Sequence, residues 1–79
     1  MVKILSIIPN SDYTISVTLD NGMSGLFNVA QFLDKGVFKE LRDLNYFNRV
    51  QNFGRYIHWP NEQDFCADTI ESLLIPSTI

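Results

Sequence analysis

Residues 13–28 read YTISVTLDNGMSGLFN and hold the strongest structural signal in this 79-residue chain. Apolar and polar residues alternate from Tyr13 to Asp20, which is typical of a β-strand with one buried face. The Asp20-Asn21-Gly22 run that follows favours a tight turn between two antiparallel strands. The stretch therefore predicts a β-hairpin that turns at Gly22.

The length of this loop determines which residues face each other. A two-residue loop would place Ser24 opposite Leu19 and put a polar group on the apolar face. A three-residue loop with Gly22 in the left-handed region keeps the apolar side chains together, and a shift of one residue would undo this register. We therefore predict the three-residue loop, which pairs Leu19 with Met23, Val17 with Gly25, Ile15 with Phe27 and Tyr13 with Val29.

Other segments predict further short strands. Val2 to Ile8 is apolar on both alternating sets of residues, which predicts a strand that is covered on both faces or lies centrally in the sheet. Val50 to Phe53 and Arg55 to Trp59 are expected to form a second hairpin around Gly54. Asp64 to Cys66 is expected to be a short extended piece.

Two short helices are expected after the first hairpin. Asn28 can cap a helix over Val29 to Asp34, with Gln31 at the reciprocal capping position and Gly36 as the stop. Val37 to Asp43 is expected to continue as a second short helical turn.

The last helix is predicted from a capping box. Asp68 and Glu71 have the spacing in which the first side chain caps the helix and the second reaches back to it. The helix should run through Leu74 until Pro76 ends it. The fold class is therefore α+β: a single domain over 1–79 with a small antiparallel sheet of about five short strands and two or three short helices packed on one face.

Composition limits the classes of function. Hydrophobic residues make up 46% of the chain and charged residues 19%, which is in the globular range. A net charge of −3 and a pI of 4.7 disfavour binding to nucleic-acid backbones or anionic lipid, because such binders rely on Lys and Arg. No stretch approaches the roughly 20 apolar residues that span a bilayer. A single cysteine fits a reducing compartment, so we expect a cytoplasmic protein with no membrane contact.

HWPNEQDFCADT, residues 58–69, contains the only His, Trp and Cys of the chain. The best set of metal ligands in this stretch is His58, Asp64, Cys66 and Asp68, and it lacks the paired spacing that zinc sites show. A structural role explains each member of that set: His58 on a strand face, Asp64 in a turn, Cys66 as a small buried side chain and Asp68 as a helix cap. We expect no metal and no cofactor.

Two functional alternatives come from the same region. A Cys66 nucleophile with His58 as its base would make a small hydrolase, since a thiol needs only a nearby base to form a thiolate. The 49–64 hairpin would bind single-stranded nucleic acid if its aromatic side chains stand on an exposed sheet face beside arginines. Lone cysteines usually pack inertly and the chain is acidic, so we expect no enzyme and give nucleic acid second place.

Three segments carry a family resemblance. They are the strand and turn from Tyr13 to Gly22, the segment Gly36-Val37-Phe38-Lys39-Glu40-Leu41-Arg42-Asp43 followed by Phe47, and Trp59-Pro60-Asn61 continuing to Asp64-Phe65-Cys66-Ala67-Asp68-Thr69-Ile70. Through them, nearly the whole chain resembles the small bacterial and phage family catalogued as domain of unknown function 2442. The departures are Leu19 where the family often has Phe, Asn28 where Asp is usual, and Glu62 where a turn Gly is common.

The resemblance implies a role but no activity. Members of the family resemble accessory domains, often encoded beside another short protein in an arrangement like a toxin–antitoxin pair, and some carry an added helix-turn-helix. This chain ends at Ile79 without such an addition, so a DNA-binding role is not expected. The family supplies no catalytic residue to transfer.

We therefore expect a non-enzymatic protein-interaction module. One form of this role is an accessory or antitoxin-like partner of a protein encoded by a neighbouring gene. An acidic chain complements a basic partner, and exposed sheet edges can accept an added strand. The candidate interaction surface lies on the 49–64 hairpin and consists of Arg49, Arg55, Tyr56, His58 and Glu62.

Overall fold

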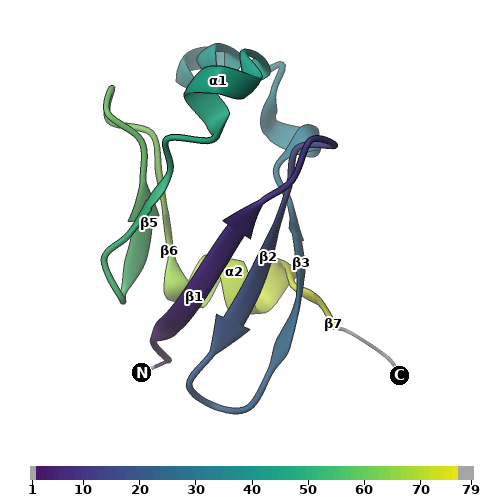
Figure 1. Cartoon of the computed structure of the whole chain (residues 1–79), viewed down its shortest axis with the longest axis vertical. Helices are drawn as coiled ribbons and strands as arrows, with labels where there is room; N and C mark the ends of the chain where they lie inside the picture. The colour runs from purple at the N-terminus through teal and green to yellow at the C-terminus, as the bar shows by residue number, and fades with distance from the viewer. Residues whose placement is uncertain (1, 77–79) are drawn as a thin grey trace.

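Two antiparallel β-sheets build the molecule, as the computed structural model describes it for residues 2–76 (Figure 1). The first sheet has the strand order β1-β2-β3-β7, and the second has the order β4-β5-β6. The first sheet comprises β1 (Ile4–Pro9), β2 (Thr14–Leu19), β3 (Ser24–Asn28) and β7 (Ile75–Pro76). The second comprises β4 (Gln51–Asn52), β5 (Tyr56–His58) and β6 (Asp64–Cys66).

The predicted register of the first hairpin is confirmed. Ile15 pairs with Phe27 and Val17 with Gly25, as the three-residue loop requires. At the loop, the backbone N–H of Leu19 donates to the Met23 carbonyl at 2.8 Å, and the backbone N–H of Val29 donates to the Tyr13 carbonyl at 3.0 Å. Gly22 has a φ of 89°, the left-handed conformation that the loop needs.

The prediction that the first strand is central or covered on both faces is wrong. β1 lies at an edge of its sheet, and Leu5 and Ile8 are 63% and 61% exposed. The pairing with β2 shifts between Ile4 and Ser6, so there is a bulge at Leu5, and apolar residues from both alternating sets face outward. Pro9 suits an edge strand because proline has no N–H to donate to a neighbour.

The second sheet was not predicted as a separate sheet. Its hairpin turns at Gly54 as expected, with a φ of 88°, and β6 extends it by one strand. The two sheets meet where the Ile4 N–H donates to the Gly54 carbonyl at 2.6 Å and the Asn52 side chain donates to the Ile4 carbonyl at 3.0 Å. The α+β class is confirmed, but about five strands in one sheet become seven described strands in two.

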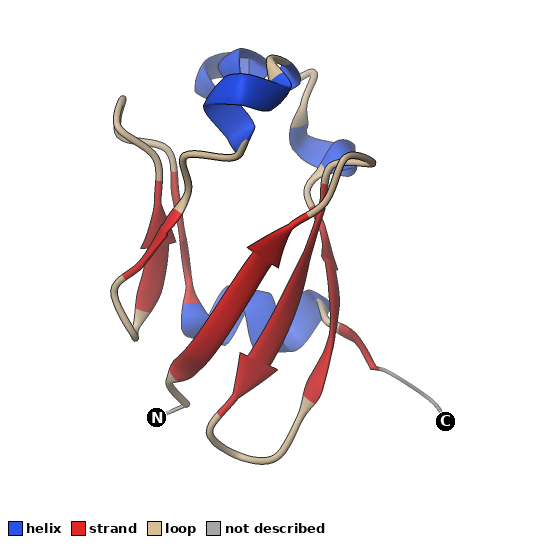
Figure 2. Cartoon of the chain, in the orientation of Figure 1, coloured by secondary structure: helices blue, strands red, loops and turns tan. Residues whose placement is uncertain are grey.

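Short helices occupy one end of the molecule and the space behind the first sheet (Figure 2). The helices at the end of the molecule, which we call the helical end, are the 3₁₀ helices η1 (Ala30–Phe32) and η2 (Gly36–Arg42) and the α-helix α1 (Leu44–Phe47). The helix α2 (Ala67–Leu73) contacts β3 and β6. The helices therefore do not all cover one face of a single sheet.

The first helical segment has Val29 in its N-cap position, and not Asn28 as predicted. The Asn28 side chain still contacts the first turn, since its Oδ1 accepts from the Ala30 N–H at 3.0 Å. The Gln31 side chain donates to the Asn28 carbonyl at 3.1 Å, where the capping box would have used the Asn28 N–H. The helix that follows is a single 3₁₀ turn, shorter than the predicted stretch.

The predicted capping box at the last helix is wrong. α2 begins at Ala67 with Cys66 in the capping position, so Asp68 lies within the first turn. The reason is tertiary: the Ala67 side chain is buried and its N–H donates to the Arg55 carbonyl at 2.7 Å, which fixes where the strand gives way to the helix. Glu71 accepts from the Asn21 side chain at 2.6 Å and therefore contacts the hairpin loop.

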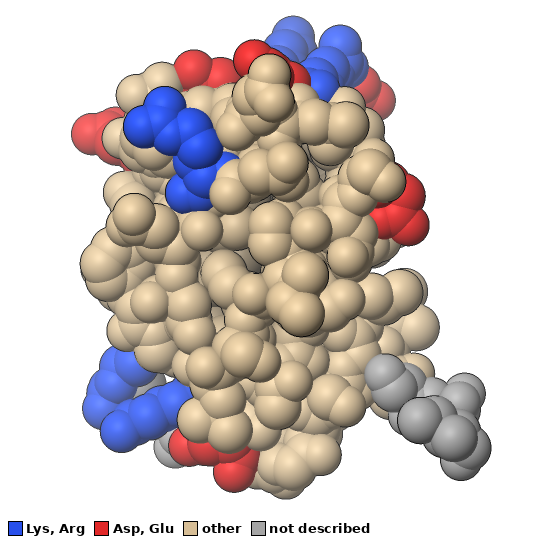
Figure 3. All heavy atoms as spheres, viewed as in Figure 1, with Lys and Arg blue, Asp and Glu red and all other residues tan. Residues whose placement is uncertain are grey.

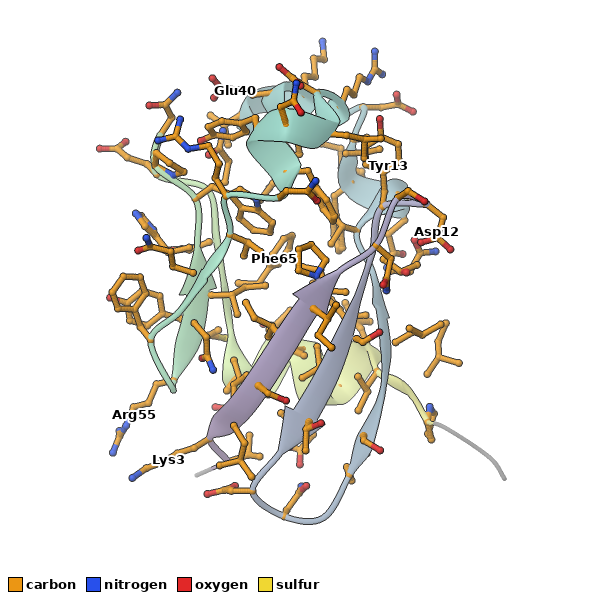
Figure 4. The ribbon with its side chains drawn as sticks, viewed as in Figure 1. Lys3, Asp12, Tyr13, Glu40, Arg55 and Phe65 are labelled. Carbon is orange, nitrogen blue, oxygen red and sulfur yellow. The ribbon has the colours of Figure 1, made fainter. Side chains whose placement is uncertain are left out.

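A shared hydrophobic core joins the two sheets. Phe27 of β3 and Phe65 of β6 meet edge to face with ring centres 4.9 Å apart, and Figure 4 shows Phe65 between the sheets. Trp59, Phe47 and Leu41 are fully buried and extend this core to the helical end. Among residues 2–76, no helix is long and apolar enough to cross a membrane.

Candidate interaction surface

The outer face of the second sheet carries exposed polar and aromatic side chains. The middle residues of β5 and β6 are buried, so their neighbours in sequence lie on the opposite face, because strand side chains alternate. The pairing places Tyr56 opposite Cys66 and His58 opposite Asp64. These four side chains therefore share one face.

Phe53 completes an aromatic cluster on this face. Its ring stacks on Tyr56 with centres 5.1 Å apart, and both rings lie edge to face with His58, at 6.0 Å and 6.3 Å. Phe53 is 51% exposed and Tyr56 is 40% exposed, which is high for large aromatic side chains. We call Phe53, Tyr56 and His58 the aromatic face.

The structure brings together only part of the predicted surface. Tyr56 and His58 lie on the aromatic face, and Arg55 lies at the lower end of the second sheet (Figure 4). Arg49 precedes β4, and Glu62 follows β5 with a φ of 80° in the β5–β6 turn, so both belong to the opposite end of the sheet. All three of these charged residues are exposed.

Phe53 was missed, although the sequence held a signal for it. The hairpin around Gly54 pairs Phe53 with Tyr56, since the Phe53 N–H donates to the Tyr56 carbonyl at 2.9 Å. A register argument like the one made for the first hairpin would have placed both rings on one face. The predicted hairpin was not given a register, so Phe53 stayed outside the candidate set.

Cys66 is exposed, so the prediction of a small buried side chain is wrong. The register puts Phe65 and Ala67 in the core and turns the intervening thiol outward. Its sulfur lies 3.1 Å from the Thr69 Oγ1, and this hydrogen bond lowers the pKa of the Cys66 thiol. Across the strands Cys66 faces Tyr56, while His58 faces Asp64, so the hydrolase pair is diagonal and the hydrolase alternative stays a prediction.

A shallow groove adjoins the aromatic face. It has a volume of about 350 Å³, which is at the small end of ligand sites. Side chains of both charges line it, together with the exposed thiol. The lining residues are Val2, Arg55, Tyr56, Asp64, Cys66, Ala67 and Asp68.

No group of three or more His, Cys, Asp or Glu side chains within residues 2–76 is arranged to hold a metal ion. The expectation of no metal and no cofactor stays a prediction.

The outer face of the first sheet is a second exposed surface, and it is uncharged. Ile8 and Leu26 flank Ser16 across three strands, and the neighbouring row contains only serine and threonine. In Figure 3, charged side chains lie around the margin of the face in view and its centre is free of them. Such a surface is usual for the solvated side of an antiparallel sheet.

The motif with the most specific family resemblance builds the core of the fold. Trp59 is fully buried, and its Nε1–H donates to the Phe47 carbonyl at 2.8 Å. The Asn61 side chain donates to Glu40 at 2.7 Å, which ties the β5–β6 turn to η2. Phe65 lies in the core as well. These residues are thus explained by folding and do not point to a ligand.

A buried amide closes the same turn. Gln63 is 2% exposed, accepts from the Tyr46 hydroxyl at 2.6 Å, and donates to the Val37 carbonyl and to Glu40, both at 2.9 Å. The Tyr46 hydroxyl also accepts from the Asn61 N–H at 2.8 Å. The second sheet is therefore fixed to the helical end by a connected polar network.

No curated protein and no solved structure is significantly similar to the chain. A family of proteins of unknown function, DUF2442, matches residues 4–76, which is nearly the whole sequence. The chain belongs to the DUF2442 family.

Proposed function

We propose that this chain is a non-enzymatic protein-interaction module that binds another protein through its aromatic face. The observation that carries the proposal is the exposed cluster of Phe53, Tyr56 and His58. Tyrosine and other aromatic side chains are enriched in the centres of protein interfaces, where they contribute much of the binding energy.

The strands that carry the aromatic face are anchored in the hydrophobic core by their inward-facing side chains. Ile57, on the inner side of β5, is fully buried, and Phe65 of β6 is 7% exposed. Because the strands are anchored in the core, the stacked rings lose little conformational freedom when a partner binds. This preorganisation supports a binding role more than exposure alone does.

Charge favours a basic partner. The chain has a net charge of −3, and Asp64 pairs with His58 on the same face. Complementary charge speeds association and suppresses wrong partners. The proposal includes an antitoxin-like role, in which a bacterial, cytoplasmic chain neutralises a basic partner encoded beside it.

Affinity purification tests the proposal. The tagged full chain is recovered from its own cells with and without nuclease, and co-purifying proteins are measured by mass spectrometry. We expect a stoichiometric protein partner that survives nuclease and is lost in the double variant Phe53→Ser with Tyr56→Ser. The matched control is Val37→Ser, because the Val37 side chain is 64% exposed on η2 and does not belong to the aromatic face. A partner retained equally by both variants would contradict the assignment of this face.

The second candidate is single-stranded nucleic-acid binding on the same face. The specific observation in its favour is that stacked aromatic rings stand exposed on a sheet with Arg55 at its end. Bases stack on such rings, and arginine contacts phosphates. Nuclease-sensitive material without a protein partner, with retention on a nucleic-acid column that falls steeply as salt rises, would favour this candidate over the first.

A further inference from the structure

The loop between β2 and β3 contains a reactive dipeptide that the proposed function does not use. Of the asparagines in the sequence, only Asn21 is followed by glycine. Asn21 and Gly22 are both exposed, and Gly22 has a φ of 89°. The Asn21 side chain is held at both ends, since its Oδ1 accepts from the Met23 N–H at 3.0 Å and its Nδ2 donates to Glu71 of α2 at 2.6 Å.

Asparagine before glycine can modify itself without an enzyme. The backbone nitrogen of the glycine forms a bond to the side-chain Cγ of the asparagine, the C–N bond to the amide nitrogen breaks, and ammonia leaves with the proton of the attacking nitrogen. The product is a cyclic succinimide. Water then opens the ring at either carbonyl and leaves an aspartate or an isoaspartate, with no change of oxidation state. Glycine favours the attack because it has no Cβ to crowd the nitrogen.

We propose that Asn21 is a site of this slow self-modification and that its hydrogen bond to Glu71 controls the rate. The attack requires the side chain to turn so that Cγ approaches the Gly22 nitrogen. This rotation breaks the hydrogen bond between Asn21 Nδ2 and Glu71 Oε2. Glu71 therefore restrains the reaction for as long as this hydrogen bond stays formed.

The modification would also change the structure, because it removes the hydrogen bond between position 21 and Glu71. A carboxylate at position 21 cannot donate to Glu71, and the two like charges repel at a distance where a hydrogen bond stood before. An isoaspartate also lengthens the backbone in a loop whose length sets the β2–β3 register. The modification adds one negative charge to an already acidic chain. It also removes the hydrogen bond between the loop and α2, and this change is irreversible.

Ageing of the purified full chain tests the proposal. The protein is held at physiological temperature and mildly alkaline pH, and each asparagine-containing peptide is followed by mass spectrometry and an isoaspartate assay. We expect conversion at Asn21, with the other asparagines serving as internal controls. The Glu71→Ala variant should convert severalfold faster, whereas Ser72→Ala, an exposed neighbour on the same helix, should match the parent. Thermal melts run beside the assay ensure that the compared variants are folded.

Two further variants separate control by Glu71 from a loss of structure. Glu71→Gln keeps an oxygen that accepts from Asn21, so its conversion should stay close to that of the parent. Asn21→Asp should lower the melting temperature, and Glu71→Gln in the same chain should restore it, because the new amide can donate to the carboxylate. An Asn21 that stays intact in the folded chain and in folded Glu71→Ala, while the urea-unfolded chain converts, would overturn the proposal. Equal rates in the parent and in Glu71→Ala would overturn the role of Glu71.

Discussion

At the scale of single residues, Glu62 has a backbone conformation that costs stability. Its φ of 80° is a conformation in which non-glycine residues are strained by about 1 kcal/mol or more. We expect Glu62→Gly to raise the free energy of unfolding by roughly 0.5–1 kcal/mol in urea titrations, since part of the relief is offset by glycine's greater freedom when unfolded. Glu62→Ala keeps the strain and is the control; equal stabilisation by both variants would contradict the explanation.

The reactivity of the Cys66 thiol depends on its neighbour Thr69. The hydrogen bond from the Thr69 hydroxyl favours the thiolate and so lowers the pKa of the Cys66 thiol. The rate of alkylation by iodoacetamide should therefore reach its half-maximum at a lower pH than for a free cysteine. In Thr69→Val the donor is gone, and the midpoint should move to higher pH. Thr18→Val, at an exposed threonine of β2, should leave it unchanged.

At the scale of elements, Gly25 permits the pairing of β7 with β3. A Cβ at this position would lie 2.0 Å from the Ile75 carbonyl oxygen, which is a backbone atom and cannot turn aside. We expect Gly25→Ala to separate β7 from the sheet, with faster hydrogen exchange at Leu26 and Ile75 and a loss of stability of roughly 1–3 kcal/mol. Gly22→Ala meets no atom within 4 Å and costs only its backbone strain, so it should leave exchange at Ile75 unchanged.

At the scale of elements, the sequence predicted correctly the features that depend on residues close together in the chain, and it failed where distant contacts decide the structure. The first hairpin follows from the alternation and turn chemistry of residues 13–28, and its register is confirmed. The capping box at Asp68 was wrong because a contact from Ala67 to the distant Arg55 sets the start of α2. The place of β1 was wrong because a bulge at Leu5 leaves no trace in the apolar pattern.

The candidate site was predicted only in part, for the same reason. Tyr56 and His58 follow from strand alternation in one hairpin, and the structure places them together. Phe53 needed the register of that hairpin. The exposed thiol of Cys66 needed the second sheet, because only the packing of Phe65 and Ala67 into the core turns Cys66 outward.

At the scale of the whole molecule, the polar network around Gln63 joins the second sheet to the helical end. Tyr46→Phe removes the hydroxyl that donates to the Gln63 side chain and accepts from the Asn61 N–H. The buried amide oxygen of Gln63 then loses a donor, so we expect a loss of about 1–3 kcal/mol in the free energy of unfolding. Tyr13→Phe is the matched control, because its hydroxyl donates to the Arg42 carbonyl in an exposed position and should cost less.

The single tryptophan makes this prediction also a test of cooperativity. Trp59 is fully buried between the second sheet and the helical end, so its fluorescence reports on the junction, whereas far-ultraviolet circular dichroism reports on all the strands and helices. Because the two sheets share one core, both signals should give the same midpoint in urea for the parent and for Tyr46→Phe. A fluorescence midpoint in Tyr46→Phe that falls below the circular-dichroism midpoint would mean that the junction opens before the sheets unfold. The aromatic face would then rest on a unit that moves separately from the first sheet.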